Sequence, residues 1–262
     1  MSAANSSNDT QDRDFVAALE RGLAVLVAFN QERDSLTITD VANATQMTRA
    51  AARRYLLTLT RLGYLVNDEK QFAITPKVLG LAQSYWHSTR LPRLVGEHLQ
   101  RLSGALGGAA TVAVLDGNDI ITVRAATDGS VLSPSTQPGA RLPAHCTANG
   151  RVLLAASLET LKDAAQIERI ESISLTQLTS HTVMSRDRLT LELRRTASQG
   201  YALTQQEFEI NMHALAVPLK NKHDLTVAAL NIIFNRAQRG TNLIEQCLPA
   251  LLRVQAELRE AL

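Results

Sequence analysis

Apolar residues recur at helical spacing in three segments near the start of the chain, and this spacing predicts three helices. The first covers residues 15–29, the second is the short stretch 39–45, and the third begins after Thr48 and ends at Gly63. A short turn at residues 46–47 leads from the second helix to the third. One face of the third helix is apolar, and its other face carries four arginines with no acid between them: Arg49, Arg53, Arg54 and Arg61.

Two short strand-like runs follow the third helix. Residues 64–66 and 72–74 are apolar and flank the polar turn 67–70, which predicts a β-hairpin. Helix, short turn, helix and hairpin are the parts of a winged helix-turn-helix, which places its last helix in the major groove of DNA. Arginine carries a planar fork of donors that suits phosphate oxygens and guanine edges. The alternative is an ordinary amphipathic helix with a solvated arginine face.

The DNA-binding interpretation gives a role to seven residues of the third helix. Arg49 and Arg53 are candidates for base contacts, because the first positions of a recognition helix reach deepest into the groove. Ala50 and Ala51 keep the helix slim and are expected to touch thymine methyl groups or sugars. The residues expected to hold phosphates are Thr48, Arg54 and Arg61.

The rest of the chain predicts another helix and then an antiparallel sheet with helices. Pro76 begins a helix that ends near residue 88, and its apolar character means that it packs against a partner subunit or against its own chain. A helix from Pro92 is stopped by glycines 107 and 108, and Asp-Gly within residues 109–125 predicts a hairpin. Further helices are predicted over 148–156, 158–167, 185–199 and 243–262, and strands over 201–206, 214–220 and 226–234.

These elements predict an α+β protein with an N-terminal winged helix-turn-helix, a linker helix and a C-terminal α+β domain. The first residues are polar and lack the apolar core of a signal peptide. The predicted boundaries are a disordered leader over residues 1–12, the DNA-binding domain over 13–75, the linker helix over 76–90 and the C-terminal domain over 91–262.

Composition limits the chemistry of the protein. A formal charge of +2 over 262 residues is too small to indicate a partner. The two cysteines, Cys146 and Cys247, form neither a disulfide framework nor a metal motif, which fits the cytoplasm, and the six histidines show no metal spacing. His145 and Cys146 are adjacent, but adjacent side chains on an extended segment point to opposite faces. We therefore expect no enzymatic activity, no metal and no cofactor.

Three segments carry more specific motifs. Residues 48–59 read Thr-Arg-Ala-Ala-Ala-Arg-Arg-Tyr-Leu-Leu-Thr-Leu, and residues 142–155 contain Pro-Ala-His-Cys-Thr-Ala-Asn-Gly-Arg. Residues 200–219 contain Gly-Tyr, Gln-Glu-Phe-Glu and Ala-Leu-Ala-Val-Pro-Leu. Together these segments resemble the IclR family of bacterial transcriptional regulators over nearly the whole chain from Phe15. Within that family they are similar to the branch that controls the breakdown of aromatic acids such as protocatechuate and 4-hydroxybenzoate.

The resemblance implies that the C-terminal domain is GAF-like and binds a small carboxylate effector. A helix N-terminus offers unpaired N–H groups and a partial positive charge, and both favour a carboxylate. Asn231 stands in an apolar strand, so its amide needs a ligand or a local structural partner. The residues that fall on or next to pocket positions of the family are Leu142, Ala148, Asn149, Thr204, Ala214 and Asn231.

One segment departs from the family pattern. Asn211, Met212 and His213 stand where the family commonly has Gly, Leu or Val, and Arg. Asparagine tolerates a left-handed backbone at modest cost, whereas histidine differs from arginine in charge and reach. If the family arginine touches the effector, the ligand preference of this chain differs from that of the aromatic-acid branch.

The sequence therefore predicts a cytoplasmic regulator that binds a pseudo-palindromic site on double-stranded DNA as a homodimer, or as a dimer of dimers. Its effector is expected to be an aromatic acid or a ring-cleavage product, and the regulator is expected to activate a catabolic operon. Two alternatives remain open: a repressor of a short aliphatic-acid pathway, and a ligand-binding module that has lost DNA binding.

Overall fold

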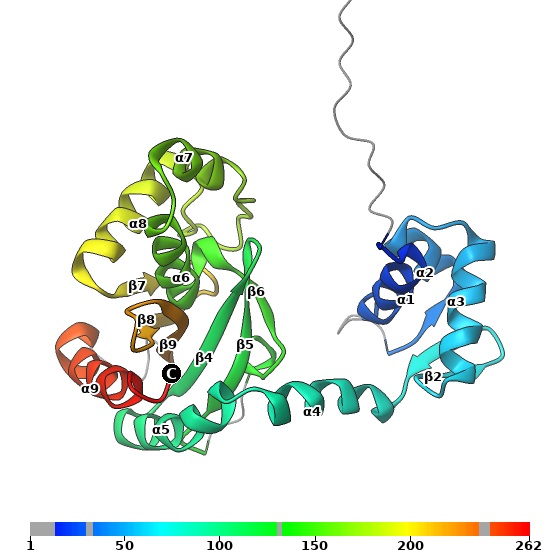
Figure 1. The fold of residues 1–262 in the computed structure, drawn as a ribbon, viewed down its shortest axis with the longest axis horizontal. Helices are drawn as coiled ribbons and strands as arrows, with labels where there is room; N and C mark the ends of the chain where they lie inside the picture. The colour runs from blue at the N-terminus through cyan, green and yellow to red at the C-terminus, as the bar shows by residue number, and fades with distance from the viewer. Residues whose placement is uncertain (1–13, 30–33, 130–132, 236–241) are drawn as a thin grey trace, which may run out of the picture. The chain divides into compact units, whose positions relative to one another are not determined.

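The chain divides into two compact units, Met1–Ser88 and Thr89–Leu262, each of which has its own buried core (Figure 1). The predicted leader lies outside the described part of the chain. No helix among the described residues is both long enough and apolar enough to cross a membrane. The computed structural model describes residues 14–29, 34–129, 133–235 and 242–262.

The N-terminal unit combines helices with a three-stranded antiparallel sheet in the order β1-β3-β2. Strands β2 and β3 form the predicted hairpin. The elements, in chain order, are α1 (Ala17–Val27), β1 (Leu36–Thr37), α2 (Ile38–Thr45), α3 (Arg49–Arg61), β2 (Leu65–Asp68), β3 (Gln71–Ile74) and, after a 3₁₀ turn at Pro76–Val78, α4 (Leu79–Ser88).

Local interactions fix the ends of α2 and α3. The Thr37 hydroxyl accepts a hydrogen bond from the Asp40 N–H at 3.2 Å, and the Asp40 carboxylate accepts one from the Thr37 N–H at 2.9 Å, which makes a capping box at the start of α2. Gln46 ends α2 in a left-handed conformation. Gly63 follows α3 with φ of 80°, a conformation that favours glycine and stops the helix where the sequence predicts.

The C-terminal unit is built on a six-stranded antiparallel sheet in the order β6-β5-β4-β9-β8-β7. Its helices cover both faces of this sheet (Figure 1). The elements are α5 (Leu91–Leu106), β4 (Ala109–Asp116), β5 (Asp119–Ala126), β6 (Arg141–Pro143), α6 (Ala148–Glu159), α7 (Asp163–Glu171), α8 (Arg186–Gln199), β7 (Ala202–Gln205), β8 (Met212–Lys220), β9 (Thr226–Asn235) and α9 (Leu243–Leu258), with 3₁₀ turns at Pro134–Thr136 and Ala144–Cys146.

One predicted helix in this unit has wrong bounds, and one short strand was not predicted. The helix predicted over 158–167 is divided between α6, which continues to Glu159, and α7, which starts only at Asp163. Apolar residues continue at helical spacing across this break, so the pattern alone could not place it. The short edge strand β6 was not predicted, because its neighbourhood is rich in proline and glycine, which usually mark loops.

The two faces of the six-stranded sheet have different side chains. We call one the close-packed face: large apolar residues of β4, β8 and β9 contact α5 and α9 there. We call the other the cavity face: its alanines contact α6, and two polar residues lie between them. The close-packed face includes Val112, Leu215, Val217, Leu219, Leu230, Ile232 and Phe234. The cavity face includes Thr111, Ala113, Ala214, Ala216, Ala229 and Asn231.

Candidate DNA-binding helix and ligand cavity

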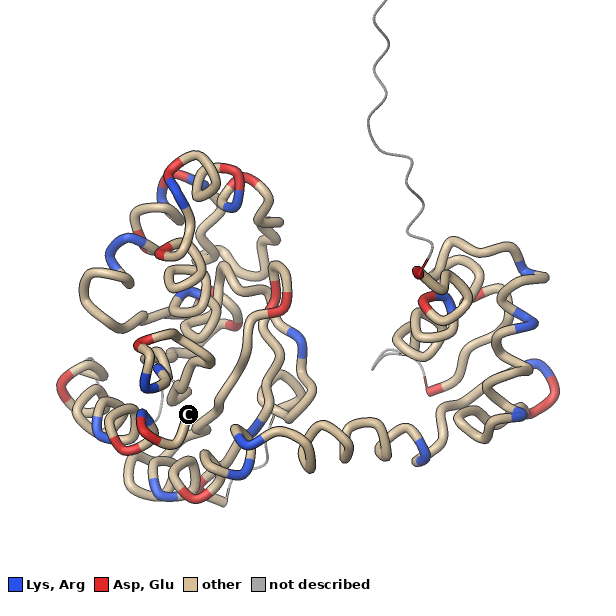
Figure 2. The backbone as a smooth tube through the Cα atoms, viewed as in Figure 1, with Lys and Arg blue, Asp and Glu red and all other residues tan. Residues whose placement is uncertain are grey.

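The arginine face of α3 is free for an external partner. The helix is held from behind by Ala52, Leu56 and Leu59, which are all buried. Among the described residues, no carboxylate forms an ion pair with the arginines of the opposite face, and Figure 2 shows positively charged positions spaced along this helix. The exposed residues of the predicted set are Thr48, Arg49, Ala50, Arg53, Arg54 and Arg61.

Two residues of the predicted set also shape the helix. The Thr48 hydroxyl accepts a hydrogen bond from the Ala51 N–H at 3.2 Å and so caps α3. Ala51 is half-buried, which leaves it less available to DNA than Ala50. The hydroxyl proton of Thr48 stays free for an acceptor, so capping and a phosphate contact are compatible.

Lys77 supports the other end of α3, a role that the sequence reasoning did not assign. Its ammonium group donates a hydrogen bond to the carbonyl oxygen of Leu62 at 2.7 Å and lies 5.1 Å from the centre of the Tyr64 ring. A cation is favourable at a helix C-terminus, where carbonyl groups lack intrahelical partners. The sequence shows only that a lysine directly follows the wing. The contact with the end of α3 appears only in the folded chain, where Lys77 lies next to Leu62.

The structure brings all six predicted effector residues together around one cavity in the C-terminal unit. The cavity has a volume of about 30 Å³ and lies between the start of α6 and the cavity face of the sheet. None of its described lining residues is charged. The predicted residues in its wall are Leu142, Ala148, Asn149, Thr204, Ala214 and Asn231. The sequence reasoning missed Thr111, Ile120, Thr122, Ser135, Thr136, Thr147, Phe208, Met212 and Ile233.

The start of α6 contributes Thr147, Ala148 and Asn149 to the lining of this cavity. The Thr147 hydroxyl accepts a hydrogen bond from the Gly150 N–H at 3.3 Å, and the Thr147 carbonyl accepts one from the Arg151 N–H at 2.9 Å. The N–H groups of Ala148 and Asn149 therefore remain as the donors of the helix end. A Cβ atom on Gly150 would lie 2.1 Å from the carbonyl oxygen of Ala144, so only glycine allows the preceding turn to pack this closely.

Three buried polar side chains form a hydrogen-bonded chain across the cavity wall. Thr111 and Asn231 are register partners on β4 and β9, and the Thr111 hydroxyl donates to Asn231 Oδ1 at 2.6 Å. The Asn149 amide donates from Nδ2 to Thr111 Oγ1 at 3.3 Å. Asn231 thus has a local partner, but that partner is a side chain and not the backbone. Asn149 Oδ1 is buried and accepts no hydrogen bond from a described residue.

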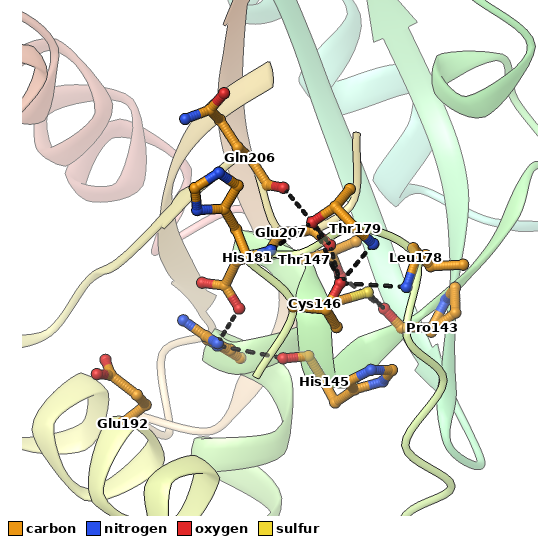
Figure 3. Close-up of polar contacts among 12 residues, drawn as sticks. Pro143, His145, Cys146, Thr147, Leu178, Thr179, His181, Glu192, Gln206 and Glu207 are labelled. Carbon is orange, nitrogen blue, oxygen red and sulfur yellow. Dashed lines mark hydrogen bonds and ion pairs between the residues drawn. The ribbon is translucent and has the colours of Figure 1, made fainter. Parts of the chain in front are cut away.

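A buried ion pair holds the segment between β7 and β8 beside the cavity. Arg151 on α6 donates to the Glu207 carboxylate at 2.5 Å, and their side chains are only 3% and 10% exposed. Arg151 also donates to the carbonyl oxygen of His145, and the Thr182 hydroxyl donates to that of Glu207. Figure 3 shows His145 and Glu207 among the polar contacts of this region. Burial raises the pKa of the Glu207 carboxyl, and Arg151 opposes that shift.

His145 and Cys146 lie in the 3₁₀ turn Ala144–Cys146, just before α6, and both side chains are buried. Burial lowers the pKa of His145, whose Nε2 lies 3.1 Å from the carbonyl oxygen of Thr176. Burial raises the pKa of the Cys146 thiol to about 12. A buried thiol with a raised pKa is an inert structural group and not a nucleophile.

The segment that departs from the family pattern is divided between the two faces of the sheet. Asn211 has a left-handed backbone with φ of 67°, as expected for a residue that stands in place of glycine. Met212 lines the cavity, but His213 is not among the residues that line it. Alternation along β8 places His213 on the side of Leu215, which belongs to the close-packed face.

A larger open groove lies between α6, α7 and α8, with a volume of about 370 Å³. It contains none of the predicted effector residues. Arg186 in its wall has a structural role, because it pairs with Glu171 at 3.2 Å and donates to the carbonyl oxygens of Ile170 and Ile173. The smaller cavity therefore remains the candidate ligand site.

Comparison with known proteins covers both units. The helix-turn-helix domain of IclR regulators matches residues 18–69, and the C-terminal domain of the bacterial transcriptional regulator IclR matches residues 83–258. The chain is 38% identical to the p-hydroxybenzoate hydroxylase transcriptional activator of Acinetobacter baylyi, over 97% of this chain and 95% of that protein. It is 36% identical to the Pca regulon regulatory protein of Pseudomonas putida, over 95% of this chain and 85% of that protein.

A solved structure of similar fold contains a ligand. It is a double mutant of the inducer-binding domain of the PobR transcription factor from Acinetobacter, in complex with 3-hydroxybenzoic acid. It superposes with a TM-score of 0.60 and 32% identity, over 66% of this chain and all of that domain. With the exposed arginine helix, the wing and the cavity domain in one chain, these similarities establish that the protein belongs to the IclR family of DNA-binding transcriptional regulators.

Proposed function

We propose that this protein activates a catabolic operon in the cytoplasm when an aromatic acid, or its ring-cleavage product, occupies the cavity beneath α6. The observation that supports this proposal most directly is a cavity with no charged residue in its described lining, where the six predicted effector residues meet from five segments of the chain. We assign residues 13–75 to the DNA-binding domain, 76–90 to the linker helix and 91–262 to the effector domain. The similar activator of Acinetobacter baylyi and the PobR domain complex with 3-hydroxybenzoic acid support this ligand class.

The ligand carboxylate accepts hydrogen bonds from the start of α6. The Ala148 and Asn149 N–H groups and the helix dipole favour an anion there, so no counter-ion is needed. Apolar residues provide the surface that a ring requires: Ile120, Leu142, Phe208, Met212 and Ile233. The effector contacts that we assign from the predicted set are Leu142, Ala148, Asn149, Thr204, Ala214 and Asn231.

The cavity volume also supports a mechanism of control. About 30 Å³ holds roughly one water molecule, so a ring enters only when the wall moves. Phe208 comes from the segment around Glu207, which connects β7 to β8 without regular structure, and Met212 is the first residue of β8 after that segment. A ligand that binds only the expanded wall shifts the equilibrium of the whole chain toward that state, which is the linkage that a regulator needs.

DNA binding requires two copies of α3 on a pseudo-palindromic operator, and we propose a homodimer. The outer face of α1 leaves Leu19, Leu23 and Val27 exposed by 62%, 50% and 80%. Helix α4 has no buried residue, although it carries Leu79, Leu81 and Tyr85. Large apolar side chains that are exposed together on one helix are typical of contacts with another chain. A second copy of this chain would cover those of α1 and those of α4. A dimer of dimers would follow from further contacts of the same protein.

The test of DNA binding uses fluorescence anisotropy with the DNA upstream of the neighbouring operon. We expect Arg53→Ala to relax sequence preference, at a cost of about 1–3 kcal/mol on the preferred site, and Arg61→Ala to weaken all sites alike. Arg188→Ala, an exposed arginine of the C-terminal unit, serves as the control and should change neither. Binding that is independent of salt, or identical effects of the two α3 variants, would contradict these roles.

The small volume of the cavity favours one other effector class, the short aliphatic acids. In that case the protein would be the repressor of a short aliphatic-acid pathway. Calorimetric titration of the full chain with benzoates, protocatechuate, ring-cleavage products and short aliphatic acids separates the two classes. Binding of aromatic acids or their ring-cleavage products supports the proposal, and binding of short aliphatic acids alone contradicts it. Effector binding without any binding to the operator would show instead a module that has lost DNA recognition.

A further inference from the structure

The hydrogen-bonded chain of Asn149, Thr111 and Asn231 has a direction, and this direction follows from its two distances. The O···O distance from Thr111 to Asn231 is 2.6 Å, which is typical of a hydroxyl donor and too short for most amide donors. The contact from Asn149 to Thr111 measures 3.3 Å, which fits an amide N–H donor. The hydroxyl proton of Thr111 therefore points to Asn231, and Asn149 must present its NH₂ group to Thr111.

One proton thus orients both amides. Thr111 has a single hydroxyl proton, and because Asn231 Oδ1 accepts it, Thr111 can only accept from Asn149. All three residues are at least 95% buried, so bulk water does not rearrange the chain. Asn149 Oδ1 is left as a buried acceptor with no donor among the described residues, in a side chain that lines the cavity.

We infer that Thr111 sets the hydrogen-bonding polarity of the cavity, so that the cavity selects carboxylate ligands with a separate hydroxyl or N–H donor. This inference rests on the proposed effector function. Such a donor satisfies Asn149 Oδ1, whereas a ligand that offers only acceptors leaves it unpaired. Thr111 does not need to touch the ligand: it is a positioning residue that acts through Asn149.

The uncharged wall of the cavity makes the direction of its hydrogen bonds important for the choice between ligands, more than in a charged site. No described lining residue carries a charge that could dominate recognition. Discrimination among aromatic acids then depends on neutral hydrogen bonds, and a site that hydrogen-bonds a substrate hydroxyl rejects the analogue that lacks it. The carboxylate is shared by all candidates, so the second polar group decides between them.

The test is calorimetric titration of the full chain with four probes: 3-hydroxybenzoate, 4-hydroxybenzoate, unsubstituted benzoate and 4-methoxybenzoate. We expect at least one hydroxybenzoate to bind about tenfold tighter than both benzoate and 4-methoxybenzoate. Benzoate controls for size, because it is smaller than the hydroxybenzoates and also lacks the donor. Equal affinities for all four probes would overturn the inference and leave the proposed function intact, whereas no binding of any aromatic acid or ring-cleavage product would overturn both.

Two variants of Thr111 separate positioning from packing. Thr111→Val removes the hydroxyl from a buried strand position that tolerates valine, releases both amides, and should reduce the preference for hydroxybenzoate at least about fivefold. Thr111→Ser keeps the hydroxyl and should keep the preference. A Thr111→Val protein that discriminates as well as the original chain would overturn the inference.

A third variant keeps the test decisive if Thr111→Val fails to fold. Asn149→Ala removes the acceptor but leaves the contact between Thr111 and Asn231. The ratio of hydroxybenzoate to 4-methoxybenzoate affinity should then approach one. Because a ratio of affinities does not change when stability alone falls, an unchanged ratio in this variant would contradict the role of Asn149 Oδ1.

Discussion

The same strands of the C-terminal unit build two faces with opposite properties. On the close-packed face, Leu215, Leu230 and Ile232 are fully buried against α5 and α9. On the cavity face, the neighbouring positions Ala214, Ala216 and Asn231 are small or polar. Because side chains alternate along a strand, one sequence can encode a stabilising core on one side and a recognition site on the other. The difference teaches that stability and ligand preference can be changed separately.

The largest expected effect concerns the buried ion pair of the cavity side. Glu207→Ala leaves the Arg151 guanidinium buried without its partner and should lower the free energy of unfolding by about 4 kcal/mol. Urea denaturation measures this loss. A double replacement, Arg151→Met with Glu207→Leu, removes both charges and should recover most of it. If the double variant is as unstable as Glu207→Ala, the attraction between the two charges outweighs the free energy lost when both are buried.

The second prediction compares the two faces directly. Leu230→Ala creates a void on the close-packed face and should cost about 3 kcal/mol in urea denaturation, while effector affinity stays the same. Thr204→Ala on the cavity face should cost at most about 1 kcal/mol but weaken effector binding in calorimetry. Loss of effector affinity in Leu230→Ala would contradict the division of stability and ligand binding between the two faces.

The third prediction concerns the start of α6. Gly150→Ala forces a Cβ atom to within 2.1 Å of the Ala144 carbonyl oxygen and should cost about 2 kcal/mol. Gly104→Ala is the matched control, because Gly104 lies in α5 with open space around it. That replacement should stabilise the protein by about 0.5–1 kcal/mol. Equal midpoint temperatures of thermal unfolding for Gly150→Ala and Gly104→Ala would show that the contact with Ala144 is not tight.

The smallest expected effect is a pH dependence. Burial lowers the pKa of His145 in the folded protein below its ordinary value of about 6.5. The unfolded chain then binds more protons at acidic pH, so the contribution of His145 to stability is present above about pH 6.5 and is lost as the pH falls. His145→Gln cannot titrate, and it should lose less stability than the original chain between pH 7 and pH 5 in thermal unfolding. An equal loss of stability between pH 7 and pH 5 in the two proteins would contradict the lowered pKa of His145.

The sequence predicted the parts of the fold that local interactions determine. The bounds of α3, the stop at Gly63 and the wing follow from spacing, caps and turn residues, and the structure confirms them. The effector residues were placed through family resemblance, and the structure brings them together at one cavity. Thr111 was missed because a threonine in a strand is ordinary, and only the register of β4 against β9 puts it opposite Asn231.

Other parts of the wall could not be predicted for the same reason. Thr122 on β5, Thr136 in a 3₁₀ turn and Phe208 between β7 and β8 meet at the cavity through contacts that are distant in sequence. No periodic pattern marks such residues: Thr122 lies in a strand whose pattern is dominated by the core, and Thr136 and Phe208 lie in connecting segments that have no period. The buried pair of Arg151 and Glu207 was missed likewise, since its partners are 56 positions apart.

The close contact between Gly150 and Ala144 constrains how the ligand range of such a protein can diverge. Any larger residue at position 150 would displace the helix end, so this end of the cavity offers few routes for evolutionary change. Positions 204, 214 and 231 lie on strands whose backbones are fixed by the sheet, so their side chains can be exchanged without moving the scaffold. New specificities would therefore arise along the strands, while the start of α6, the proposed anion-binding end, is inherited unchanged.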